Sequence, residues 1–66
     1  MHIGKRLKML RENRELSQEN LANELDVSQS AYSKWESEKS DISFLNLNRI
    51  AEFYKITLSE LFDGIT

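Results

Sequence analysis

The amino-acid sequence predicts an all-α fold, a compact five-helix bundle in which the second and third helices form a helix-turn-helix. Apolar residues recur every three or four positions, as amphipathic helices require, and no segment has the pattern of a strand. A serine or threonine that suits a helix N-cap stands directly before four of the five periodic segments. Proline is absent, and no linker, repeat or low-complexity segment divides the 66 residues. We therefore expect a single domain over residues 1–66.

The stretch from residue 18 to residue 37 organises the chain, because it predicts two short helices broken between Leu25 and Ser28. Ala22 suits a steep crossing in which two backbones approach closely. Asp26 suits the turn, since its short side chain bonds nearby backbone and tolerates the left-handed conformation. The apolar or small residues that define the two helices are Leu21, Ala22, Leu25, Val27, Ala31, Tyr32 and Trp35.

The second of these helices, residues 29–36, is expected to have two different faces. Its outward face carries Gln29, Ser30, Ser33 and Lys34, and its inward face carries Ala31, Tyr32 and Trp35. The two aromatic rings are expected in the core and not stacked on nucleic-acid bases. Ser28 is expected to cap the helix and not to contact a ligand.

Three further helices complete the prediction. The first spans Ile3 to Asn13, with Ile3, Leu7 and Leu10 on one face and basic residues on the other. Residues 14–16 link it to the next helix, which Ser17 caps.

After a polar loop from Ser37 to Ile42, the fourth helix spans Phe44 to Tyr54 and follows Ser43. The last helix spans Leu58 to Phe62, and residues 63–66 are expected to fray. Thr57 and Glu60 stand in the T-x-x-E arrangement of a capping box.

Charge is distributed unevenly along the chain, although the formal net charge is only −2. Residues 1–14 hold five basic residues and one acidic residue, which gives +4, whereas the remainder carries −6. Because salt limits surface electrostatics to about 10 Å, such a domain can still present one basic face to DNA. The acidic residues in the rest of the chain disfavour binding to nucleic acid without sequence preference.

Composition argues against several classes of protein. No apolar run approaches the roughly 20 residues of a membrane span. Cysteine is absent and no signal peptide opens the chain, so cytoplasmic residence is expected. His2 is the only histidine, and no metal-ligand cluster or phosphate-binding glycine loop is present. We expect no enzyme activity, cofactor, metal or small-molecule ligand.

Three segments together resemble the lambda-repressor-like helix-turn-helix family, also called the Cro or xenobiotic-response-element class. They are IGKRLKMLRE, LSQENLANELDVSQSAYSKWE and LNRIAEFYKITLSELF, and the likeness covers Ile3 to Phe62. Members of that family are five-helix bundles that bind operator DNA, usually as twofold dimers, and regulate transcription. The resemblance therefore implies a sequence-specific transcriptional regulator, expected to be a repressor, with double-stranded DNA and a second copy as partners.

The resemblance also assigns roles to individual positions. Residues at base-contacting positions are Gln29, Ser30, Ser33 and Lys34. Residues at phosphate-contacting positions are Gln18, Ser37 and Lys39. Arg11 and Glu36 occupy the positions of an ion pair that ties the first helix to the third.

This sequence departs from the family pattern at three turns. Glu15, Asp26 and Glu38 stand where many members have glycine with a positive φ. Glu38 also brings a negative charge to the expected phosphate path, beside Lys39.

Two alternatives differ from the repressor hypothesis. A protein-interaction module, such as an antitoxin or an adaptor, is favoured by the net acidity. A restriction-modification controller would keep the DNA-binding mode in another genetic setting.

Overall fold

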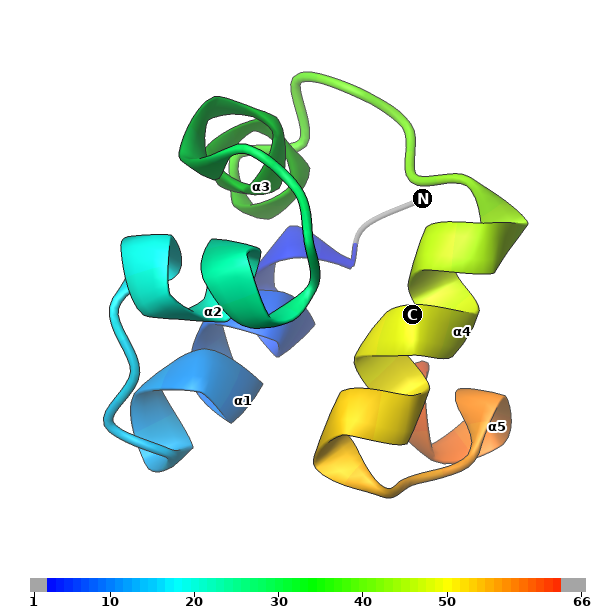
Figure 1. Cartoon of the computed structure of the whole chain (residues 1–66). Helices are drawn as coiled ribbons and strands as arrows, with labels where there is room; N and C mark the ends of the chain where they lie inside the picture. Colours follow the sequence, from blue (N-terminus) through cyan, green and yellow to red (C-terminus); the bar gives the residue numbers. More distant parts are fainter. Residues whose placement is uncertain (1–2, 64–66) are drawn as a thin grey trace.

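The computed structural model describes residues 3–63 and contains five α-helices. They are α1 (Gly4–Asn13), α2 (Gln18–Glu24), α3 (Gln29–Glu36), α4 (Phe44–Tyr54) and α5 (Leu58–Leu61). The described residues contain no strand, so the predicted all-α fold is confirmed. In Figure 1, α1, α2 and α3 gather on one side, α4 stands on the other, and α5 lies at the end of α4 farther from α3.

The helix ends follow the capping residues in the sequence. Ser17, Ser28, Ser43 and Thr57 each accept a hydrogen bond from the backbone N–H three residues later. Thr57 and Glu60 form the predicted capping box, with reciprocal bonds of 2.8 and 3.0 Å. Because each bond satisfies an amide that lacks a partner in the first turn, local sequence determines where these four helices begin.

Two predicted boundaries were one residue too long. Ile3 lies just before α1 as its N-cap residue, and Phe62 lies just after α5 as its C-cap residue. The predicted fraying at residues 64–66 falls outside the described residues.

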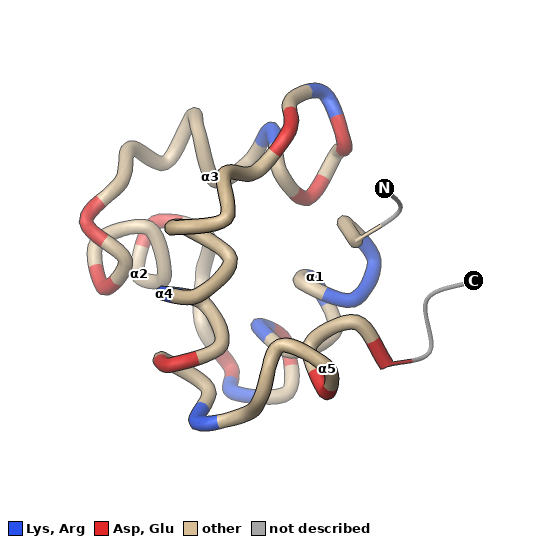
Figure 2. The backbone as a smooth tube through the Cα atoms, turned by 90° about the vertical axis from the view of Figure 1, so that its right-hand side faces the viewer, with Lys and Arg blue, Asp and Glu red and all other residues tan. Residues whose placement is uncertain are grey.

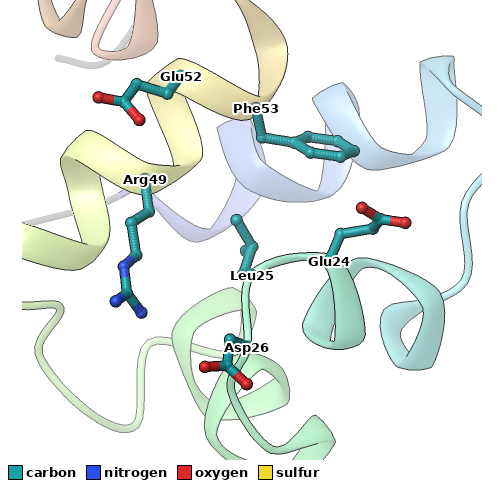
Figure 3. A pocket seen from close by; sticks show the side chains of 6 residues that line it. All are labelled: Glu24, Leu25, Asp26, Arg49, Glu52 and Phe53. Atoms are coloured by element: carbon teal, nitrogen blue, oxygen red, sulfur yellow. The ribbon is translucent and has the colours of Figure 1, made fainter.

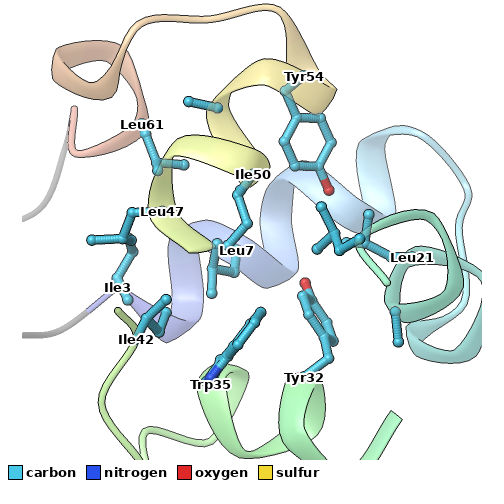
Figure 4. Packing of buried hydrophobic residues seen from close by; sticks show 13 residues of the cluster. Ile3, Leu7, Leu21, Tyr32, Trp35, Ile42, Leu47, Ile50, Tyr54 and Leu61 are labelled. Carbon is cyan, nitrogen blue, oxygen red and sulfur yellow. The ribbon is translucent and has the colours of Figure 1, made fainter. Parts of the chain in front are cut away.

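The core lies where the inner faces of all five helices meet (Figure 4). The helix-turn-helix contributes Leu21, Ala22, Leu25, Tyr32 and Trp35, each no more than 5% exposed. Burial of Ala22 agrees with the close crossing of α2 and α3. Since about 60% of the unfolded surface is buried in a domain of this size, the margin of stability is small and depends on these contacts.

Gly4 lies where α1 meets the end of α3. A Cβ atom built on Gly4 lies too close to the backbone carbonyl of Glu36, so only glycine permits this approach. The N–H of Gly4 also donates to the Glu38 carboxylate over 3.0 Å. A residue in the loop after α3 therefore caps α1, which has no cap from its own N-cap side chain.

The three departures from the glycine pattern all adopt the left-handed conformation. Glu15, Asp26 and Glu38 have φ values of 56°, 59° and 61°. Lys55, which ends α4, has a φ of 57° and was not anticipated. Residues with a Cβ atom are strained there by roughly 1–2 kcal/mol, and less for Asp.

Replacing Glu15 by glycine is expected to stabilise the fold by about 0.5–1 kcal/mol. Relief of strain at a positive φ exceeds the entropy that glycine adds to the unfolded chain. Thermal unfolding followed by circular dichroism measures the change. Glu12→Gly, inside α1, is the matched control and is expected to destabilise by about 1 kcal/mol. A lower melting temperature for Glu15→Gly contradicts strain at this turn.

Candidate nucleic-acid interface

The outer face of α3 is polar and open to solvent. Gln29, Ser30 and Lys34 are exposed, and Ser33 is half-buried. None of these four side chains makes a hydrogen bond to another residue within 3–63. The candidate base-contacting residues thus lie together with their donors and acceptors available, which is the condition for bonding to base edges in a groove.

The opposite face of α3 anchors the helix in the core. Tyr32 is 0% exposed and Trp35 is 5% exposed, as expected for core residues. Their rings form an edge-to-face contact with 5.8 Å between centroids. Such a pair adds about 0.5–1.5 kcal/mol to the burial of the rings. The orientation of the polar face is therefore determined by two large side chains that have no freedom to turn outward.

The loop after α3 begins with a compact turn. Lys39 donates its backbone N–H to the carbonyl of Lys34 over 2.9 Å, and Glu38 donates to Trp35 over 3.2 Å. The Ser37 hydroxyl donates to the Lys34 carbonyl over 3.3 Å. This turn holds the exposed side chains of Ser37 and Lys39 close to the end of α3.

A network of side chains ties the first three helices together. Arg11 of α1 makes two bonds to the Glu36 carboxylate of α3, at 2.7 and 3.2 Å, and a third to the Leu16 carbonyl at 2.9 Å. Gln18, at the start of α2, donates its side-chain amide to Glu36 over 3.0 Å. Because an amide nitrogen carries two hydrogens, Gln18 keeps a second side-chain donor while Glu36 orients the amide.

The ionisation of this network follows from its surroundings. The hydrogen bond to Glu36 is the main cause that raises the pKa of Arg11. Burial acts to raise the pKa of Glu36, but the hydrogen bonds and the positive charge of Arg11 outweigh it, so the pKa lies below its ordinary value. Burial also raises the pKa of Tyr54 to about 12. Arg11 and Glu36 are thus both charged at neutral pH.

Two arginines, one in α1 and one directly after it, contact residues near the C-terminal end of the chain. Arg6 donates to the carbonyls of Glu60 and Leu61 at the end of α5, over 2.9 and 3.3 Å. The Arg14 guanidinium lies 5.4 Å from the centre of the Tyr54 ring. These partners stand 40 or more residues away, so the local sequence carries no signal that identifies them.

The candidate interface carries little net positive charge. Lys34 and Lys39 are its cations, while Glu38 and Asp41 flank Lys39 in the loop (Figure 2). The Glu38 carboxylate accepts the Gly4 N–H and is thereby directed toward the start of α1.

Other kinds of site are not seen in the described part of the chain. Residues 3–63 contain no group of three or more His, Cys, Asp or Glu side chains arranged to hold a metal ion. Among the same residues, no helix has the length and apolar character needed to cross a membrane.

This arrangement defines a class of protein. Two short crossed helices, with the second exposing a polar face and held from behind by buried aromatic rings, form a helix-turn-helix of the kind that enters the major groove of DNA. The chain belongs to the helix-turn-helix domain family, whose model matches residues 4–66.

Two relatives match almost the whole chain. It is 42% identical over 66 residues to "Control protein C.MunI" of Mycoplasma sp. That alignment covers 98% of this chain and 89% of the relative. It is 41% identical over 64 residues to "HTH-type transcriptional activator BcrR" of Enterococcus faecalis, which covers 97% of this chain but only 31% of that relative. Fold and family together make the chain a helix-turn-helix domain of the DNA-binding class.

Proposed function

We propose that this chain is a sequence-specific, cytoplasmic transcriptional regulator that reads the major groove of DNA with α3. The observation that carries the proposal is the exposed polar face of α3, with Gln29, Ser30 and Lys34 in solvent and Tyr32 and Trp35 buried behind them. Amide side chains can bond adenine bidentately, and lysine can reach the acceptors of guanine. Its role is to bind and not to catalyse.

Phosphate contacts at the ends of the helix-turn-helix are expected to hold α3 in the groove. Gln18 lies at the first turn of α2, and Ser37 and Lys39 follow α3 directly. With Lys39 as the cationic side chain assigned to phosphate in each copy, the salt dependence is expected to be shallow. A slope of about −0.9 per neutralised phosphate predicts a slope of roughly −1 per copy.

Selection of bound sequences from a random pool of duplex DNA, at two stated salt concentrations, tests the proposal. We expect enrichment of a defined site of roughly twofold symmetry and weaker binding at the higher salt. Binding without any sequence preference, or none at either concentration, contradicts the proposal. If instead the chain purifies with another protein and does not bind DNA, the antitoxin or adaptor alternative is favoured.

We also propose that the chain acts as a homodimer joined near the start of α4. Phe44 and Leu45 are 69% and 62% exposed there, in neighbouring positions. Large apolar side chains exposed together indicate an interaction surface. With principal dimensions of 26 × 24 × 21 Å, two copies side by side can place their α3 helices about one DNA turn, or roughly 34 Å, apart.

Sedimentation equilibrium measures this association. The variant Leu45→Asp is expected to weaken self-association at least tenfold, because it buries a charge in the contact. Met9→Asp is the matched control, since Met9 is 51% exposed but lies on α1. Equal effects of the two variants, or a wild-type chain that stays monomeric, contradict this contact.

The names of the relatives bear on two questions: whether the chain activates or represses transcription, and in which genetic system it acts. The nearly full-length match to a control protein supports the restriction-modification controller alternative, and the partial match to BcrR supports activation. The family resemblance favours repression. A reporter gene placed downstream of the selected site distinguishes repression from activation.

A further inference from the structure

A groove of about 330 Å³ opens between the α2–α3 turn and α4 (Figure 3). Leu25 and Phe53 provide its apolar lining and pack with the hydrophobic core. The other side chains that line it are Glu24, Asp26, Arg49 and Glu52. The smallest ligand sites in proteins have volumes of about 300 Å³, so this groove lies at the lower end of that range. Such a volume suits one or two long side chains.

The charges around the groove are not neutralised by the protein. Glu24, Asp26, Arg49 and Glu52 are exposed, and within residues 3–63 none of their side chains forms an ion pair or a hydrogen bond. Three carboxylates against one guanidinium give a local charge of −2. A phosphate backbone is repelled by such a surface, so this groove does not extend the DNA interface.

An arginine or lysine side chain is complementary to both features of the groove. Its aliphatic stem can lie along the apolar lining while its charged end stays at the wet rim. A cation beside the Phe53 ring also gains from the ring's negative face. An adjacent apolar residue in the same segment can contact Leu25.

We propose that this groove binds a segment of a partner protein that presents two arginine or lysine side chains beside apolar residues. One cation pairs with Glu24 and the other with Glu52, whose carboxylates lie on either side of the Phe53 side chain (Figure 3). Asp26 lies two residues before Ser28, the cap of α3, so the partner is held beside the helix that reads DNA. The proposed contact with a partner protein is separate from DNA binding and requires no change in the conformation of α3.

The probe is the synthetic peptide acetyl-Leu-Arg-Leu-Leu-Arg-amide, titrated into the ¹⁵N-labelled chain. Saturable shifts are expected in the amide signals of residues 24–26 and 49–53. Glu24→Gln/Glu52→Gln is expected to weaken binding at least threefold, because each exposed ion pair contributes little alone. Arg49→Ala is expected to tighten binding about twofold, since it removes the one like charge.

The matched control is Glu12→Gln/Glu15→Gln, which makes the same change of net charge away from the groove and is expected to bind the peptide as the wild type does. Equal weakening by the control, shifts centred on α1 or α3, or no tightening by Arg49→Ala overturns the proposal. DNA affinity of the Glu24→Gln/Glu52→Gln variant is measured separately and is not expected to fall. The two measurements thereby distinguish a groove that does not bind the peptide from a chain that does not bind DNA.

Discussion

Replacing Glu36 by alanine is expected to cost about 3–5 kcal/mol, because it leaves the Arg11 guanidinium in a partly buried site without its carboxylate. The two side chains are only 12% and 6% exposed, so water replaces the lost carboxylate poorly. The entire stability expected for a domain of 66 residues is about 3–10 kcal/mol. Urea unfolding followed by Trp35 fluorescence measures the loss.

Two companion variants separate the ion pair from the general effect of substitution. Glu12→Ala, on the exposed side of α1, is expected to change stability by no more than about 0.5 kcal/mol. The double variant Arg11→Met/Glu36→Met is expected to lose less stability than the single variants Arg11→Met and Glu36→Met lose when their losses are added. No unpaired charge remains in the double variant. Additive losses in this cycle contradict an energetic coupling between Arg11 and Glu36.

The pH dependence of stability provides a second measurement of the same network. Since the pKa of Glu36 is lowered in the folded state, its contribution is fully present above the ordinary value of 4.5. That contribution is lost as the pH falls through the folded value, when the carboxylate takes up a proton. Glu36→Gln is expected to flatten this part of the stability curve. An unchanged acid transition in that variant contradicts the assignment.

The local sequence predicted the helices well because their ends depend on neighbouring residues. The bounds of the third and fourth helices were correct to the residue, and all four predicted caps form. The left-handed turns at Glu15, Asp26 and Glu38 were expected because the family resemblance marks these positions. Lys55 was missed because a lysine in that place carries no local signal of a positive φ.

Contacts between distant segments could not be predicted in the same way. The bonds from Arg6 to the end of α5 and from Gly4 to Glu38 join residues at least 34 positions apart. Amphipathic periodicity shows which face of a helix is buried but not which helix covers it. The α3 face was predictable because Tyr32 and Trp35 determine the inward side, whereas the groove beside α4 depends on how two elements pack.

The roles of Lys34 and Lys39 are expected to separate in DNA binding. Lys34→Ala is expected to lose about 10- to 100-fold in affinity for the selected site and to relax preference at particular base pairs, as loss of a base contact does. Lys39→Ala is expected to weaken binding to all sequences alike and to lower the salt slope by about 1 per copy, as loss of a phosphate contact does.

Binding of each variant to the selected site and to single-base variants of it, at several salt concentrations, measures this difference. Lys8→Ala is the matched control, because Lys8 is an exposed lysine on α1 outside the proposed interface, and it is expected to change neither specificity nor slope. Lys34 reads bases only if Lys34→Ala alters the ranking of sites. Identical effects of Lys34→Ala and Lys39→Ala on that ranking contradict this division of roles between the two lysines.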